Sequence, residues 1–138
     1  MAKTRMWALG FIAGFAATLV FHQPVLWLFH LMHVSPRAPY AMNPVPPFGV
    51  PAVISLAFWG GVWGVIMIPL IAKAKGAGWW IAAIAFGAVF PTLVAGLIIA
   101  PLKHMQMPHT PAMVLLGLSV NGAWGLGTAF FYRLFGGK

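Results

Sequence analysis

Residues 50–72 read VPAVISLAFWGGVWGVIMIPLIA, a continuous run of apolar and small side chains that contains no charged residue. A helix of about 20 residues crosses the roughly 30 Å apolar core of a bilayer, so this run is long enough to span it. A strand of a membrane barrel would instead alternate polar and apolar positions over about 10 residues. The stretch therefore predicts a membrane-spanning helix.

Three further stretches have the same character, and none carries an internal Lys or Arg: residues 6–33 with a break expected at Pro24, residues 79–100 and residues 111–132. The first stretch follows Lys3 and Arg5, as a signal peptide would. Its apolar character continues past Ala16 and Ala17, the small residues that would form a cleavage site, so we expect an uncleaved span. The chain is predicted to be a single all-α transmembrane domain, a four-helix bundle.

The composition excludes an ordinary soluble domain and several classes of chemistry. Of the 138 residues, 62% are hydrophobic and 6% are charged, with 8 Lys and Arg, no Asp or Glu and no Cys. A soluble domain carries about a quarter charged residues. Carboxylate pairs for acid–base catalysis, hard-cation sites, thiolate nucleophiles and iron–sulfur clusters cannot be built. We expect no enzymatic activity.

The cations are distributed unevenly between the two predicted sides of the membrane. Six of the eight fall in segments that share one side, namely Lys3, Arg5, Lys73, Lys75, Arg133 and Lys138, and the opposite loops hold only Arg37 and Lys103. The positive-inside rule then places both termini in the cytoplasm of a bacterial inner membrane. The cations are expected to face anionic lipid headgroups, and their dispersal argues against nucleic acid as a partner.

The loop at residues 35–51 lies on the outer side in this topology and contains six prolines. So much proline cannot continue a helix or enter the interior of a sheet. The loop is also rich in apolar side chains, unlike a solvated linker. A lid packed across the outer face, a docking segment for another protein and a connector at headgroup depth are all compatible with this composition.

A short signature recurs in the second and fourth spans. Residues 60–65 read GGVWGV, and residues 121–126 read NGAWGL. The two spans run in the same direction, so the recurrence predicts a duplicated helical hairpin with a pseudo-two-fold axis along the membrane normal. Convergent helix packing in an alphabet of Gly, Ala, Val and Trp is the alternative.

Small residues spaced four apart predict the helix contacts. In lipid, helices associate through close backbone approach and interhelical hydrogen bonds, because apolar side chains gain nothing by leaving the acyl chains. The predicted packing residues are Gly10, Gly14, Gly60, Gly61, Gly64, Gly87, Gly117 and Gly125. Most should serve the bundle itself, and the surplus favours a homo-oligomer or a larger membrane complex.

One polar site is predicted within the membrane. His22 lies about 24 Å along the first span, and an ionisable group at that depth is a functional candidate. The polar candidates are His22, Gln23, Thr92 and Asn121. The alternative is a neutral imidazole that bonds to Asn121, to Thr92 or to the backbone carbonyls that Pro24 frees.

A second, weaker candidate is a metal site on the outer side. Imidazole and thioether groups suit copper, and the residues that carry them are His30, His33, His104, Met105, Met107 and His109. Their spacing matches no closed site. A haem would need axial histidines that face each other across the bundle, and only His22 is deep enough. We assign no cofactor, with copper and haem as alternatives.

Three segments carry a resemblance to known proteins: FHQ at residues 21–23, the loop from Ala38 to Pro51, and SLAFWGGVWG at residues 55–64. They resemble a family of small four-helix bacterial inner-membrane proteins that has no assigned activity. The resemblance covers about the first half of the chain. It implies the fold and the membrane, but no site residues.

Together these features predict a structural, assembly or accessory subunit of the inner membrane. A small channel or transporter is the main alternative. With a net charge of +8 and no acidic ring, it would conduct anions or neutral solutes rather than cations. A His/Met metal-binding or haem-binding membrane protein is the third possibility.

Overall fold

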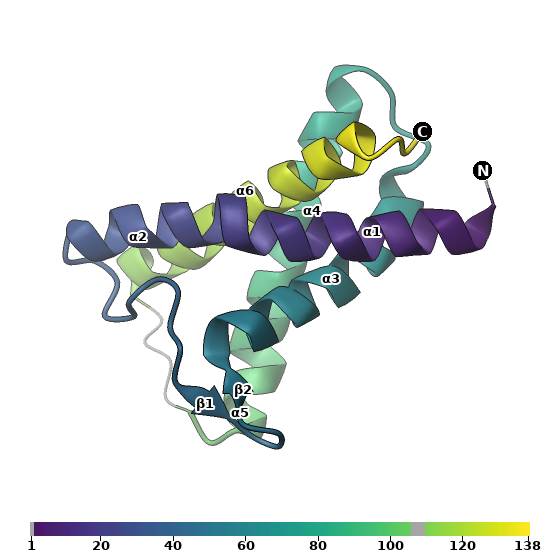
Figure 1. Ribbon diagram of the computed structural model, residues 1–138. Helices are drawn as coiled ribbons and strands as arrows, with labels where there is room; N and C mark the ends of the chain where they lie inside the picture. Colours follow the sequence, from purple (N-terminus) through teal and green to yellow (C-terminus); the bar gives the residue numbers. More distant parts are fainter. Residues whose placement is uncertain (1, 106–109) are drawn as a thin grey trace.

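The structure is a computed structural model that describes residues 2–105 and 110–138. Within these residues four helices are long and apolar enough to cross a membrane: Lys3–Leu31, Ala52–Ile71, Ala77–Leu102 and Pro111–Leu134. The four predicted helical stretches are therefore confirmed, with ends that differ by a few residues. Figure 1 shows their order along the chain.

The first and third helices are each built from three segments. The first consists of α1 (Lys3–Ala17), the π-helical η1 (Thr18–His22) and α2 (Gln23–Leu31), and the third of α4 (Ala77–Val94), the π-helical η2 (Ala95–Ile99) and α5 (Ala100–Leu102). The second helix is α3 (Ala52–Ile71) and the fourth is α6 (Pro111–Leu134).

The break predicted at Pro24 is wrong, because the helix continues through this residue. A proline lacks the N–H of its turn, and its ring clashes with the carbonyl four residues earlier. The preceding turn is widened into η1, which makes room for the ring without ending the helix. The same device recurs in the third helix, where η2 ends two residues before Pro101.

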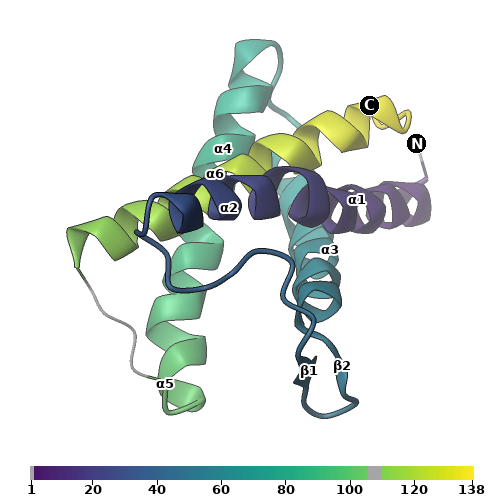
Figure 2. The ribbon, with the colours of Figure 1, turned by 60° about the vertical axis from the view of Figure 1, so that its left-hand side comes forward.

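The helices pack as two crossed pairs. In the first pair α1 packs against α3, and in the second α4 packs against α6. The first helix also lies against α6. In Figure 2, the first helix and α6 run alongside each other while α3 and α4 cross them. Close backbone contact at glycines lets helices cross at one point and then diverge, which accounts for the open arrangement.

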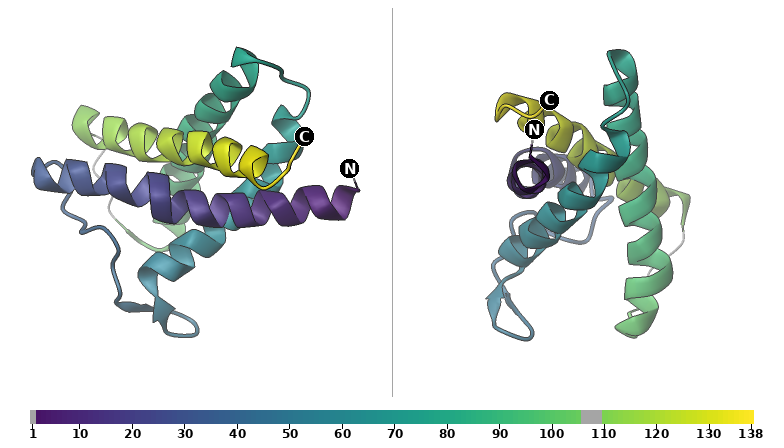
Figure 3. Two further views of the ribbon diagram at one scale, coloured as in Figure 1. Left: turned by 45° about the horizontal axis from the view of Figure 1, so that its top comes forward. Right: turned by 90° about the vertical axis from the view of Figure 1, so that its right-hand side faces the viewer.

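The chain ends and the turn between α3 and α4 lie toward one end of the molecule (Figures 1 and 3). The β hairpin and α5 lie toward the opposite end. This arrangement groups the segments that the charge pattern assigned to one side. Lys73 and Lys75 of the turn therefore lie at the same end as both termini.

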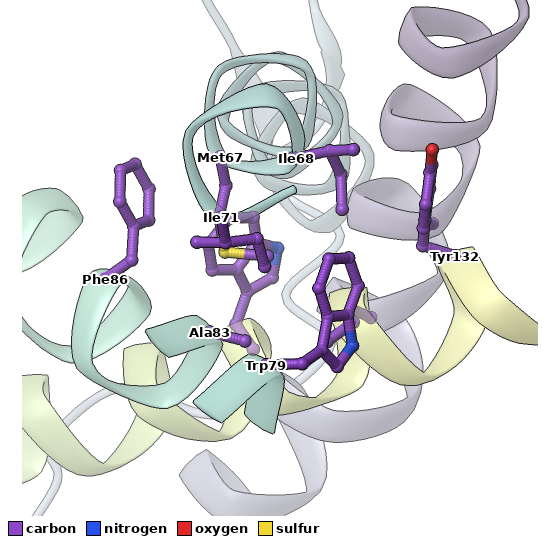
Figure 4. Close-up of a cluster of buried hydrophobic side chains, with 11 residues drawn as sticks. Met67, Ile68, Ile71, Trp79, Ala83, Phe86 and Tyr132 are labelled. Atoms are coloured by element: carbon purple, nitrogen blue, oxygen red, sulfur yellow. The ribbon is translucent and has the colours of Figure 1, made fainter. Parts of the chain in front are cut away.

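Apolar side chains fill the interior and also cover the outer surface. Met67 and Ile68 of α3 are fully buried against Trp79 and Ala83 of α4 and Tyr132 of α6 (Figure 4). Large apolar residues are also exposed on all four helices, among them Leu31, Leu70, Leu97 and Phe130. A helix that is apolar all round requires apolar surroundings.

The proline-rich segment forms a short hairpin and leads into α3. Strand β1 (Pro44–Val45) pairs antiparallel with β2 (Val50–Pro51), with Pro44 opposite Pro51. Backbone carbonyls of the loop accept hydrogen bonds from the first two N–H groups of α3. The Ala52 N–H donates to the Asn43 carbonyl and the Val53 N–H to the Ala41 carbonyl, each at 2.9 Å. The segment thus fixes the start of α3, while Phe48 at its tip is 88% exposed.

Candidate functional site

The candidate site begins at a carbonyl that the first helix cannot satisfy. In η1 the hydrogen bonds run from each residue to the one five before it, and the Gln23 N–H bonds to the Thr18 carbonyl in this way. The next bond in the series would join Pro24 to the Leu19 carbonyl, but proline has no N–H. The hydroxyl of Tyr40 donates to that oxygen instead, at 2.7 Å.

Tyr40 makes a second contact with the same helix. Its backbone N–H donates to Oε1 of Gln23 at 2.6 Å. Its φ angle of 53° places it in the left-handed region, which reverses the chain locally so that backbone and side chain both reach the helix. Gln23 is only 2% exposed, so its amide is a buried polar group that needs these partners.

The hydrogen bonds continue from Gln23 toward α6 and α4. The Gln23 amide nitrogen lies 3.1 Å from Nδ1 of His22, and the His22 side chain is hydrogen-bonded to Asn121. Nδ2 of Asn121 donates to Oγ1 of Thr92 at 2.9 Å. The four predicted polar residues therefore meet in one place. With Tyr40 they form what we call the polar chain: Tyr40, Gln23, His22, Asn121 and Thr92.

The polar chain has one consistent direction. Because the Gln23 amide nitrogen is a donor, Nδ1 of His22 must accept, and the ring proton is assigned to Nε2. A protonated Nε2 can only donate, so the amide oxygen of Asn121 is assigned as its acceptor in the hydrogen bond between these two side chains. Two amides, an imidazole and a hydroxyl thus satisfy one another. Chemically, the arrangement ties the proline-rich loop to three helices.

Part of the polar chain was not visible in the sequence. His22 does bond to Asn121, as one of the sequence alternatives proposed, but Tyr40 and not His22 takes the carbonyl freed by Pro24. In the sequence, Tyr40 is one of several large side chains of the proline-rich loop. The hydroxyl group and the nearby proline were the available signals, but neither specifies a contact 21 residues away.

The first helix meets α3 and α6 at the carbonyl of Gly14. This oxygen accepts from Oγ1 of Thr18 at 3.0 Å and from Nε1 of Trp124 at 3.1 Å. Gly14 and Gly60 lie backbone to backbone, because a Cβ on Gly60 would stand 2.9 Å from the Gly14 oxygen. Gly64 lies in the same way against the backbone of Gly10.

The pair α4 and α6 makes the same kind of close backbone contact. It does so at the positions of residues 121–126 that align with residues 60–65 in the predicted repeat. Asn121 and Gly125 of α6 lie against Gly87 of α4, and Gly125 also meets the backbone of Ala83. Gly60 and Asn121, which occupy matching positions, each lie next to a threonine hydroxyl. A Cβ on Gly60 would meet the Thr18 hydroxyl, and the Asn121 side chain bonds to the Thr92 hydroxyl. Matching sequence positions therefore make matching contacts in the two halves.

The predicted packing glycines all lie against other residues of this chain. Beyond the contacts above, Gly61 faces the ring of Phe11, and Gly117 faces the methyl group of Thr92. None of these eight glycines is therefore left without a neighbour in the chain, and the expected homo-oligomer or larger complex stays a prediction. The crossed geometry uses every one of them, because two helices that meet at a point require small residues on both.

The predicted metal ligands are not gathered in the described part of the chain. His30 and His33 line an open depression after α2, where Nδ1 of His30 bonds to the Ser35 carbonyl at 3.0 Å. His104 and Met105 follow α5, which lies apart from the end of α2 in Figure 1. Met107 and His109 lie outside the described residues. Among the residues described, no three His side chains form a group that could hold a metal ion.

Comparisons with known proteins give no relative for this chain. No protein-family model, no curated protein and no solved structure matches it. The resemblance to small inner-membrane proteins therefore stays a prediction.

Proposed function

We propose that this chain is a multi-pass protein of the bacterial inner membrane that acts as a structural, assembly or accessory subunit. The polar chain is the observation that carries the proposal. Gln23 is buried and His22, Asn121 and Thr92 are partly buried, and their polar groups bond to one another and hold the outer loop, the first helix, α4 and α6 together. This is the arrangement of a fixed scaffold, because a site for catalysis or transport needs polar atoms that remain open to a substrate.

The surface supports a bilayer as the surroundings. Large apolar side chains are exposed along every long helix, and the described helices contain no acidic residue. The first helix has 29 residues and is about 43 Å long, more than the roughly 30 Å apolar core. The first helix is therefore proposed to lie tilted in the bilayer. The proposal also places both termini in the cytoplasm.

The third helix offers the face that a partner would cover. Its last part is exposed at Phe90, Leu93 and Leu97, and η2 contains no buried residue. Gly96 lies in η2, and no described atom of a neighbouring element comes within 4 Å of the place where its Cβ would stand. A small residue within an exposed apolar helix permits close approach of another helix.

The topology can be tested directly because the chain has no cysteine. Single cysteines at Ala2, Lys138 and Phe48 would be labelled in inverted and right-side-out membrane vesicles with a reagent that does not cross the bilayer. Ala2→Cys and Lys138→Cys should react from the cytoplasmic side, and Phe48→Cys from the opposite side. Termini that react from different sides would overturn the proposed topology.

The subunit role is tested by gentle extraction into nanodiscs followed by mass measurement of the assembly. The wild type should be recovered as an oligomer or with a larger partner. Gly96→Phe should release a monomer of unchanged helix content, whereas Ile81→Phe, at an exposed position of α4, should not. A wild-type monomer without a co-purifying protein would contradict the proposal.

A small channel or transporter for anions or neutral solutes is the alternative, since the net charge is +8. Flux of chloride or glycerol into proteoliposomes, absent with a His22→Leu variant, would favour it over the subunit role. A metal-binding or haem-binding protein would show saturable uptake of Cu(I) or a haem absorption band after purification.

A further inference from the structure

Arg133 at the end of α6 is held by two tryptophans from the first turn of α4. The central carbon of its guanidinium lies 4.7 Å from the ring centre of Trp79 and 5.4 Å from that of Trp80. Arg133 is exposed, and Trp79 is buried next to Tyr132 (Figure 4). A cation–π contact uses the positive charge of the guanidinium and does not consume its N–H donors, which lie in the guanidinium plane and can bind another group.

A second guanidinium lies close to the turn that follows α6. The N–H groups of Gly136 and Gly137 donate to the carbonyls of Arg133 and Tyr132 at 3.1 and 2.8 Å, which folds the C-terminus back. A Cβ on Gly136, whose φ is 88°, would stand 3.1 Å from Nη2 of Arg5. Arg5 of the first helix and Arg133 of the last helix therefore lie beside the same turn.

These two arginines have no acidic side chain to pair with, because the whole sequence contains no Asp and no Glu. Lys3 and Lys138 add positive charge at the same end of the molecule (Figure 3). A guanidinium group that no acidic side chain can pair with is suited to an anion from outside the chain. Phosphate oxygens fit the planar fork of arginine in a bidentate manner.

We propose that Arg5 and Arg133 form a specific site for the phosphate group of an anionic phospholipid in the cytoplasmic leaflet. The inference rests on the proposed topology, which puts this end of the chain at the cytoplasmic surface. Trp79 and Trp80 then lie at the depth where tryptophans occur at a membrane interface. The lipid phosphate would bridge the first and last helices and supply the negative charge that the protein lacks.

The test measures how much phosphatidylglycerol stays bound to the full chain when it is released from nanodiscs of mixed phosphatidylglycerol and phosphatidylcholine into a native mass spectrometer. Arg133→Gln and Arg5→Gln should each lower the retained phosphatidylglycerol about fivefold, the factor expected for one lost cation near an anionic surface. Arg37→Gln, which removes an arginine at the opposite end, should leave retention unchanged. An equal loss in Arg37→Gln would show general charge attraction and overturn the site.

Two further arms separate the explanations. Arg133→Lys keeps the charge but not the planar fork, so it should retain less lipid than the wild type. Arg5→Gln lies outside the tryptophan stack, so its helix content and melting temperature should match the wild type while lipid is lost. Displacement of the lipid by millimolar inorganic phosphate would overturn the lipid assignment in favour of free phosphate. Unchanged retention in both Gln variants that still show the proposed topology would overturn this inference alone.

Discussion

The hydroxyl oxygen of Tyr40 lies 2.7 Å from the carbonyl oxygen of Leu19, the one group in η1 whose helical partner is removed by Pro24. A proline in a helix normally leaves such a carbonyl to water or to a neighbouring side chain. Here the proline-rich loop supplies the donor. The loop and the irregular turn of the first helix are therefore a matched pair, each completing the hydrogen bonds of the other.

The first prediction is a coupling between Tyr40 and Pro24. Tyr40→Phe should lower the free energy of unfolding by about 1 kcal/mol, because the Leu19 carbonyl loses its donor. In a Pro24→Ala background the same change should cost much less, since the alanine restores a backbone N–H that can bond to Leu19. A double-mutant cycle of denaturation in detergent measures the coupling. Equal costs in the two backgrounds would contradict this account.

The second prediction concerns the crossing of α1 and α3. Gly14→Ala should destabilise the chain by about 1–3 kcal/mol or more, because its Cβ would collide with the backbone of Gly60. Gly78→Ala, in the first turn of α4 where the structure has open space, is the matched control. It should be neutral or raise stability by up to about 1 kcal/mol, since alanine favours helix over glycine. Thermal unfolding followed by circular dichroism separates the two, and similar shifts would count against the crossing.

The third prediction concerns the tautomer of His22. Within the polar chain, Nδ1 accepts from Gln23 and Nε2 carries the proton. Nitrogen NMR of the labelled histidine in bilayers should therefore show an unprotonated Nδ1. Asn121→Ala should leave Nδ1 unprotonated, because the Gln23 bond persists, but should shift the Nε2 resonance. A wild-type ring that is protonated on Nδ1 would reverse the assigned direction of the chain.

The fourth prediction compares two histidines. His22→Leu leaves the Gln23 amide and Asn121 without a partner, which should lower the free energy of unfolding by about 1–3 kcal/mol. His33→Asn, at an exposed position after α2 whose φ of 59° asparagine also adopts, should have little effect. Chemical denaturation of the two variants in the same detergent tests this. A larger loss for His33→Asn would argue that the polar chain does not hold the helices together.

The fifth prediction isolates one bond at the Gly14 carbonyl. Trp124→Phe removes the indole N–H that donates to this oxygen and should cost about 0.5–1.5 kcal/mol beyond the lost ring area. The Thr18 hydroxyl still donates there, so the carbonyl is not left unpaired. Trp59→Phe, at a position that is 57% exposed, controls for the change in ring size. Equal melting temperatures for the two variants would contradict the assignment.

Much of the fold could be predicted from the sequence because the requirements of a bilayer act locally. Length and uniform apolarity define each helix, so the four stretches can be predicted without any tertiary contact. The glycines spaced four apart marked the crossings, because close approach of backbones requires small residues at both positions. The depth of His22 made it a candidate, and Asn121 was one of the partners that the sequence offered for its ring.

The features that sequence could not predict depend on geometry between distant segments. Pro24 indicated a disturbance in the helix, but whether a helix breaks or widens depends on what satisfies the freed carbonyl. That partner, Tyr40, comes from the proline-rich loop. The sequence likewise could not predict that all the packing glycines make contacts within one chain. Their spacing indicates a helix face lined by small residues, but not which helix packs on that face.

The two π segments change how the results of a mutational scan along these helices must be interpreted. Each fits one extra residue into a turn, so side chains beyond it are rotated by about 100° relative to a helical wheel drawn from the start of the helix. A scan of single substitutions along Lys3–Leu31 would show a stripe of sensitive positions that changes phase after His22. Residues before and after the π segment that i, i+3 and i+4 spacing would place on the same face therefore lie on different faces of the helix.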